Sequence, residues 1–140
     1  MNLYAESSAV LAWLLDEPES AAVRDLLGNA TVVASELTLI ECDRALLRGA
    51  ALGHLKEADA AERHAHLAST AAHWHLFRLT PDVVTRARQR FPAEPIRTLD
   101  ALHLASALAA RSAIPGLEIL SLDDRVRRAG AQLGFAVQPA

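Results

Sequence analysis

The segment Leu117-Glu118-Ile119-Leu120-Ser121-Leu122, followed directly by Asp123, gives the clearest indication of how this chain folds. Its short apolar run predicts a buried strand, and the residues from Asp123 to Leu133 have helical spacing that ends at Gly134. A strand that leads straight into a helix is the repeating unit of an α/β fold with a parallel sheet. The segment therefore predicts both the fold class and an acidic residue at the carboxyl end of a strand.

The same alternation recurs along the rest of the chain. We expect further strands at residues 3–6, 31–35 and 75–79, and an edge strand at 135–137. Helices are expected at residues 9–15, 19–27, 36–52, 56–71, 80–91 and 98–112, the last beginning at Thr98 or Asp100. Ser7 and Ser8 are natural N-cap residues for the first helix. The pattern predicts an α/β sandwich with a mostly parallel sheet.

Length and composition limit the possible classes of protein. At 140 residues with 51% hydrophobic and 22% charged residues, we expect one globular domain over residues 1–140. The net charge of −3 gives no overall positive field, so nucleic acid would have to be bound by local patches.

Cysteine content and apolar patterning point to the cytoplasm. Cys42 is the only cysteine, so no internal disulfide can form, which suits a reducing compartment. The first 15 residues contain Glu6 and no Lys or Arg, and are a poor match to a signal peptide. No apolar run approaches the roughly 20 residues that span a bilayer. We expect a cytoplasmic protein without a membrane segment.

Four acidic residues interrupt otherwise apolar segments: Glu6, Glu41, Asp100 and Asp123. Burial costs an ionised carboxylate roughly several kcal/mol of hydration free energy, so a buried carboxylate needs a partner. No Lys or Arg pairs obviously with all four in the sequence. Glu6 and Asp123 follow predicted parallel strands, and the functional crevice of such folds lies at the carboxyl ends of the strands.

A divalent cation is the simplest common partner for these acids. Two carboxylates about 5 Å apart repel by about 3 kcal/mol at an effective dielectric constant near 20. Ligand sets made only of oxygen suit Mg²⁺ or Mn²⁺, whereas zinc usually takes His or Cys. Such an ion can hold a phosphodiester and activate water.

Arginines near the acids are candidates for binding phosphate groups. Arg44 and Arg48 follow Glu41 at helical spacing, and the alternative for them is an ordinary ion pair within the helix. Arg97 precedes Asp100, and Arg125 follows Asp123. We expect Arg44, Arg97 and Arg125 to contact the phosphates of a nucleic acid. His103, three residues after Asp100, is interpreted as a structural histidine beside the site.

Taken in order, these motifs resemble the PIN-domain family, in particular the VapC-type toxins of toxin–antitoxin pairs. The resemblance covers nearly the whole chain and rests on the segments at residues 3–10, 16–20, 35–41, 97–105, 120–126 and 131–135. It implies a three-layer α/β/α sandwich around a short, mostly parallel sheet. It also implies a Mg²⁺- or Mn²⁺-dependent endoribonuclease that is inhibited by a small antitoxin protein and commonly forms a homodimer.

The resemblance assigns a role to individual residues. By it, Glu6, Glu41, Asp100 and Asp123 are the four catalytic acids, of which Glu6, Asp100 and Asp123 bind the metal directly. Ser8, Ser121 and Asp124 are candidate supporting residues, and the spacing from Ser121 favours Asp123 over Asp124 as the ligand. The family usually has Asp where this chain has Glu6. The extra methylene moves the carboxylate by more than about 1 Å, while Mg²⁺ demands near-octahedral geometry.

Two other classes of function are compatible with the acidic residues. The first is a catalytically idle module of the same fold, whose acidic groove binds an arginine of the antitoxin, and the longer side chain at Glu6 is its main support. The second is a receiver-like domain phosphorylated on Asp123 or Asp100. It would need a lysine at the site, and Lys56 is the only lysine in the chain.

Overall fold

A computed structural model describes all residues from 1 to 140 and contains five strands and seven helices. The strands are β1 (Asn2–Ala5), β2 (Thr31–Ser35), β3 (His75–Phe77), β4 (Leu117–Leu120) and β5 (Val137–Gln138). The helices are α1 (Ser7–Leu14), α2 (Ser20–Gly28), α3 (Glu36–Ala51), α4 (Glu57–Ala71), α5 (Pro81–Ala87), α6 (Thr98–Ala113) and α7 (Asp124–Gln132). The predicted alternation of strands and helices is confirmed.

The five strands form one sheet in the order β3-β2-β1-β4-β5, and every pair is parallel. β1 lies at the centre, where Leu3 is paired with Val32 on β2 and with Glu118 on β4. All five carboxyl ends therefore lie at the same edge of the sheet, as the sequence pattern predicted.

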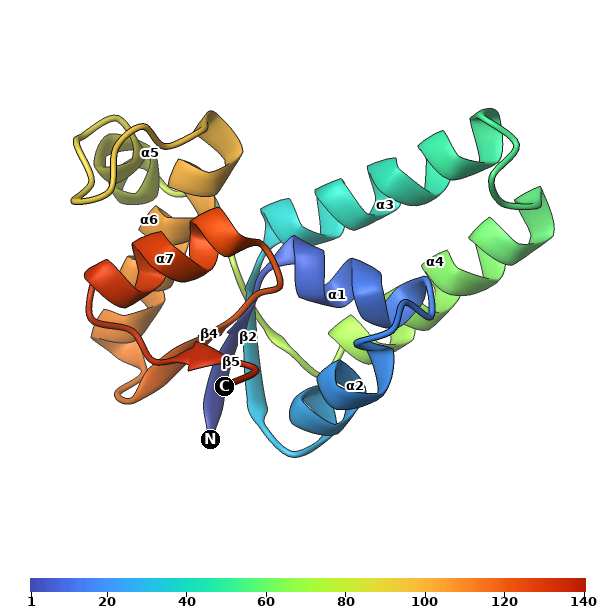
Figure 1. Cartoon of the computed structure of the whole chain (residues 1–140), viewed down its shortest axis with the longest axis horizontal. Coiled ribbons are helices and arrows are strands. Elements are labelled where there is room, and N and C mark those ends of the chain that lie inside the picture. The colour runs from blue at the N-terminus through green and yellow to red at the C-terminus, as the bar shows by residue number, and fades with distance from the viewer.

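Helices cover both faces of the sheet, which makes the predicted three-layer α/β/α sandwich. Tyr4 packs into a core cluster with residues of α5, α6 and α7, whereas Leu3 and Ala5 pack into a second cluster with residues of α1 to α4. Neighbouring residues of a strand point to opposite faces, so β1 contributes to both cores. Figure 1 shows the two groups of helices on either side of the strands.

Two helices close to the carboxyl edge of the sheet begin at residues whose side chains cap them. Ser35 accepts a hydrogen bond from the backbone N–H of Leu37 at the start of α3, and Asp123 caps α7 in the same way. The N-terminal ends of α1, α3 and α7 lie together above this edge (Figure 1). Helix N-termini carry partial positive charge, so this is a favourable place for carboxylates.

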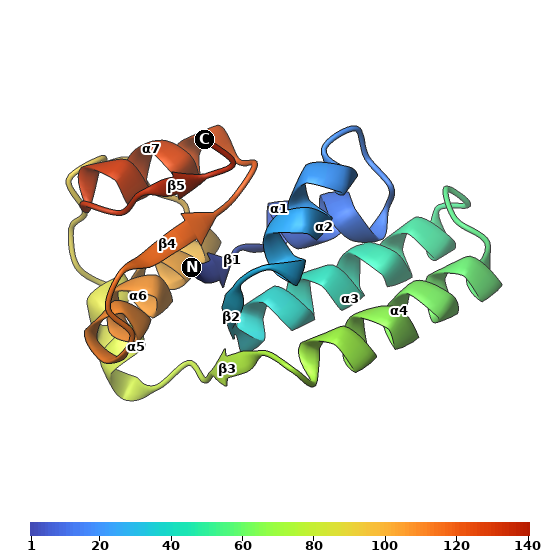
Figure 2. The same cartoon turned by 90° about the horizontal axis from the view of Figure 1, so that it is seen from below.

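The helices α3 and α4 form an arm that extends away from the sheet. They lie side by side in both views (Figures 1 and 2). None of the helices in the molecule is long and apolar enough to cross a membrane.

Several predicted boundaries are wrong by a few residues. The strand expected at 117–122 ends at Leu120, the strand expected at 75–79 ends at Phe77, and the edge strand lies at 137–138. The helix expected to reach residue 91 ends at Ala87. The first helix begins at Ser7, so its N-cap is Glu6 rather than Ser7 or Ser8, and the two serine side chains are free for other contacts.

Candidate active site

Glu6 is the most deeply buried of the four acids, with 5% of its surface exposed. It follows β1 directly, and its backbone N–H donates to the carbonyl of Leu120 on β4. Its Oε2 accepts hydrogen bonds from Ser8 Oγ at 2.5 Å and from Ser121 Oγ at 2.7 Å. Two hydroxyl groups thus stabilise this carboxylate without any positive charge.

Ser8 also fixes the turn that carries Asp123. Its Oγ accepts hydrogen bonds from the backbone N–H groups of Leu122 and Asp123, at 2.9 and 3.1 Å. Ser121 Oγ accepts from the same N–H of Asp123 at 3.1 Å. The two serines that the sequence singled out therefore connect the first acid to the fourth.

Glu41 lies on α3 and is held through one oxygen. Its Oε1 accepts hydrogen bonds from Ser7 Oγ at 2.8 Å and from His103 Nε2 at 2.5 Å. Partial burial would raise the pKa of the Glu41 carboxyl, but the hydrogen bonds from His103 and Ser7 outweigh it, so the pKa lies below its usual value. Glu41 forms no ion pair with Arg44 or Arg48, so the alternative of a pair within the helix is wrong.

His103 connects Glu41 to the centre of the sheet. It lies on α6 and is 1% exposed, and its Nδ1 is 2.8 Å from the hydroxyl of Tyr4 on β1. Its Nε2 is also 3.0 Å from Ser7 Oγ. The sequence indicated a structural histidine beside the site, but gave no sign that Tyr4 and Ser7 would contact it.

Arg97 links the two remaining acids. Its Nε donates to Asp100 Oδ2 at 3.0 Å, and its Nη2 donates to Asp123 Oδ2 at 3.4 Å. The Asp100 side chain is 11% exposed, whereas that of Arg97 is 60% exposed. Asp123 uses its other oxygen to cap α7, accepting from the N–H groups of Arg125 and Val126.

These contacts correct one step of the sequence argument. The sequence showed no Lys or Arg that would pair with all four acids, and a metal ion was the expected common partner. In the structure Arg97 pairs with two of the acids, and hydroxyl groups and an imidazole satisfy the other two. No three His, Cys, Asp or Glu side chains lie close enough together to hold a metal ion. The positive charge that lies between Asp100 and Asp123 is the guanidinium group of Arg97.

Three of the acids keep one oxygen free of hydrogen bonds to the protein: Glu6 Oε1, Glu41 Oε2 and Asp100 Oδ1. No buried side-chain nitrogen or oxygen lacks a partner, so these oxygens reach solvent. Free carboxylate oxygens at one edge of the sheet are the hard ligands that Mg²⁺ and Mn²⁺ take. The chemistry of this donor set fits such an ion, although the side chains do not close around one point.

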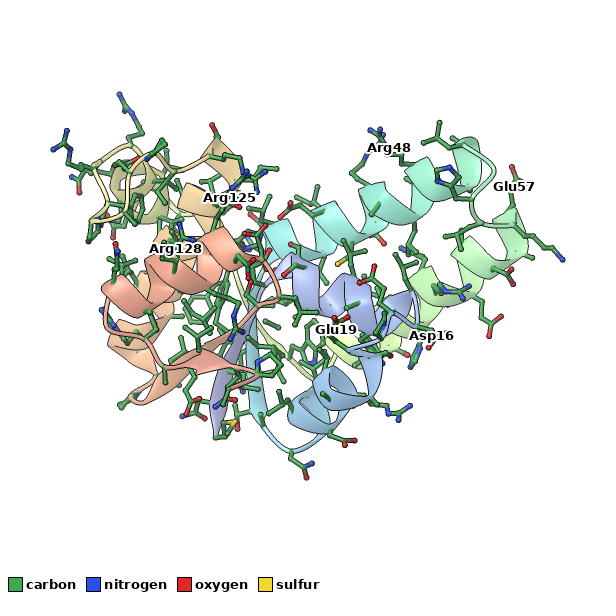
Figure 3. All side chains as sticks on the ribbon, viewed as in Figure 1. Asp16, Glu19, Arg48, Glu57, Arg125 and Arg128 are labelled. Carbon is green, nitrogen blue, oxygen red and sulfur yellow. The ribbon has the colours of Figure 1, made fainter.

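The other candidate residues lie at the surface. Asp124, Arg44 and Arg125 are exposed, and their side chains form no hydrogen bond or ion pair within the protein. Figure 3 shows Arg125 near the start of α7 and Arg48 on the arm formed by α3 and α4. Cys42 is buried, and burial raises the pKa of its thiol, so it is a poor nucleophile.

Comparisons with known proteins agree on one family. The PIN domain family profile matches residues 3–132. Ribonuclease VapC46 of Mycobacterium tuberculosis is 35% identical over 136 residues, which cover 96% of this chain and 95% of that protein. Ribonuclease VapC35 of the same species is 30% identical over 138 residues, which cover 96% and 94%.

Two solved structures share the fold. One is the VapBC2 complex of Rickettsia felis bound to a DNA fragment from its promoter, with a TM-score of 0.64, 11% identity and coverage of 99% and 98% of the two chains. The other is the Mycobacterium tuberculosis toxin VapC20, described as cleaving the sarcin–ricin loop, with a TM-score of 0.66, 15% identity and coverage of 91% and 95%. At these identities the two structures support the fold alone.

Proposed function

This chain belongs to the PIN-domain family, and we propose that it is a metal-dependent endoribonuclease, the toxin of a toxin–antitoxin pair, which hydrolyses RNA phosphodiester bonds. The observation that carries the proposal is the group of four acids contributed by separate elements at the carboxyl edge of the sheet. The relatives that cover almost the whole chain are named ribonucleases, which supports the same activity.

We propose Mg²⁺ or Mn²⁺ as the cofactor. Glu6, Asp100 and Asp123 would hold the ion, and when bound it would neutralise these acids, orient a phosphodiester and activate water. The free oxygens of Glu6 and Asp100 support this assignment. The guanidinium group between Asp100 and Asp123 supports it too, because it indicates that this position favours positive charge.

The protein's own side chains would carry out the other steps. Glu41 would orient the attacking water with its free oxygen, because its other oxygen is held by Ser7 and His103. Arg44, Arg97 and Arg125 would contact phosphates of the RNA. For Arg97 this requires that it leave at least one of its two acidic partners when the substrate binds.

The activity is tested by incubating the purified protein with total RNA in Mg²⁺, in Mn²⁺ and in EDTA. We expect cleavage that needs the metal and that is lost in Asp100→Asn. Asp25→Asn is the matched control, because Asp25 is an exposed acid on α2, the helix that leads into the amino end of β2. Cleavage in EDTA, or cleavage by Asp100→Asn at the rate of the wild type, would contradict the proposal.

One observation supports the alternative, an idle module that binds an arginine of a partner. Two of the acids, Asp100 and Asp123, already bind an arginine of this chain, Arg97. The ribonuclease names of the relatives favour the enzyme over this alternative. A well-folded protein that binds its partner but cuts no RNA with any metal ion would favour the idle module over the enzyme.

We also propose a small antitoxin as the partner of this protein in the cytoplasm. A structural neighbour is a VapBC complex, which is consistent with such a partner. The arm carries a cavity of about 540 Å³ whose apolar lining comes from both helices, Leu46, Leu47, Ala50, Ala51, Ala60 and Ala61. Leu47 and Leu52 are more than half exposed.

We place the antitoxin on this surface, and a homodimer contact is the second use that we expect for it. Leu47→Arg should abolish co-purification with the antitoxin if the arm binds it. A variant that still binds the antitoxin but elutes as a smaller species would assign the surface to the homodimer.

A further inference from the structure

A hydrogen-bond network runs from the sheet to Glu41 through side chains of two other helices. It joins Tyr4 on β1, His103 on α6 and Glu41 on α3, with Ser7 on α1 contacting the last two. Tyr4 and His103 are each 1% exposed. Tyr4 and Ser7 lie far from His103 and Glu41 in the sequence, so the convergence of the network is a property of the fold.

The contacts determine where the proton of the imidazole lies. A carboxylate can only accept hydrogen bonds, and Ser7 Oγ already donates its own proton to Glu41, so both groups need a hydrogen on His103 Nε2. Burial raises the pKa of the Tyr4 phenol, so its O–H remains a donor. In the neutral ring, Nδ1 then accepts the hydrogen bond of Tyr4.

Both hydrogen bonds to Glu41 end on the same oxygen. Ser7 and His103 donate to Oε1, whereas Oε2 accepts none and reaches solvent. The carboxylate is thereby anchored through one oxygen, and its other oxygen is left without a protein partner. A histidine with only a packing role would need neither this geometry nor a buried donor behind it.

We propose that His103, held by Tyr4, is a positioning residue that sets the orientation of Glu41 for the reaction. The inference rests on the proposed ribonuclease activity, in which Glu41 orients the attacking water. His103 does not touch the substrate and acts only through Glu41. Groups that hold a functional side chain in this way are typically worth about 10- to 100-fold in activity.

The first part of the test is spectroscopic and needs no activity. Long-range ¹H–¹⁵N correlation spectra of the wild type should show His103 protonated at Nε2 and unprotonated at Nδ1. Tyr4→Phe should shift the Nδ1 resonance because it removes the donor to that atom. A ring protonated at Nδ1 and bare at Nε2 would overturn the inference.

The second part separates positioning from folding. His103→Met fills the space without a donor, and we expect kcat for RNA cleavage to fall about 10- to 100-fold while KM stays within about twofold. His103→Gln keeps an N–H that can reach Glu41 and should recover most of the loss. His73→Gln, an exposed histidine after α4, is the matched control.

Thermal melting of each variant shows whether it is folded. A folded His103→Met with the kcat of the wild type would overturn the inference, and so would a His103→Gln that is as slow as His103→Met. If the wild type cuts no RNA at all, the proposed function fails by itself, and the spectra still decide whether the histidine holds Glu41 as described.

Discussion

The two halves of the acidic site are held in opposite ways. Around Glu41, the contacts come from a histidine whose side chain is 2% exposed and from a buried serine. Around Asp100 and Asp123, the contact comes from Arg97, whose side chain is 60% exposed. The first half is a network of short hydrogen bonds inside the protein, and the second is an ion pair at its surface.

This difference indicates which half can change when a ligand binds. Buried polar interactions are screened by salt much less than exposed ones, and buried hydrogen bonds are costly to leave unmade. Exposed ion pairs are worth about 0–1 kcal/mol and weaken with ionic strength. We therefore expect the Glu41 half to be preformed, and the Asp100–Asp123 half to rearrange when a metal ion or a phosphate replaces Arg97.

The largest expected effect separates the two roles of Asp123. Asn caps helices about as well as Asp, so Asp123→Asn should keep the start of α7 and lose at least about 100-fold in RNA cleavage. Asp123→Ala should lose the same activity and about 1 kcal/mol of unfolding free energy as well. Activity assays and urea denaturation measure the two effects, and equal stabilities of the two variants would contradict the capping role.

The next effect tests the buried half. Ser7 is 4% exposed and donates to an ionised group, so Ser7→Ala should lower the free energy of unfolding by about 1.5–3 kcal/mol. Ser112→Ala is the control, because this exposed serine donates only to a carbonyl of its own helix. Its change should stay within about 0.5 kcal/mol. A Ser7→Ala variant as stable as this control would show that the Glu41 half is not held as we describe.

A smaller effect is expected in the exposed half. Arg97→Met should change the free energy of unfolding by less than about 1 kcal/mol. It should also tighten Mn²⁺ binding by up to about fivefold at low salt, because the ion no longer competes with a guanidinium group. Isothermal titration measures the Mn²⁺ affinities of the wild type and of Arg97→Met, and Arg24→Met is the control for the loss of one positive charge. Equal affinities of wild type and Arg97→Met at low salt would show that Arg97 does not compete for the acids.

The smallest effect concerns pH. The folded-state pKa of Glu41 lies below its usual value, so this group stabilises the fold above the ordinary glutamate pKa of about 4.3. The contribution is lost as the pH falls through the folded-state pKa. The wild type should therefore lose more stability than Glu41→Gln between pH 6 and pH 3 in urea denaturation. The same loss in both proteins would contradict the shift.

The sequence predicted the fold because the fold depends on local patterns. Short apolar runs followed by helical periods indicated a parallel sheet. Most boundary errors lie at the ends of elements, and the one at the end of β4 lies where the chain forms the site. Ser121 and Leu122 continue the apolar run of β4, but they lie outside the strand and their turn presents Asp123. The loop after α5 is held by Glu94, which binds two backbone N–H groups, and no local periodicity shows this.

The acids were recognisable from sequence because charged residues stand out in apolar segments, but their partners were not. Tyr4 and His103 are 99 residues apart, and Arg97 reaches Asp123 across 26 residues. Ser7 looked like a helix cap, and only the packing of α1 against α3 turns its hydroxyl toward Glu41. Contacts of this kind follow from the arrangement of the elements and leave no pattern in a single sequence.

Mn²⁺ titration of the partner-free wild type, followed by electron paramagnetic resonance together with the rate of RNA cleavage, tests the central claim most directly. We predict that the cleavage rate rises in proportion to bound Mn²⁺, and that Asp100→Asn loses both Mn²⁺ binding and RNA cleavage. Cleavage that is complete before any Mn²⁺ is bound, or that continues in Asp100→Asn without bound metal, would contradict the account.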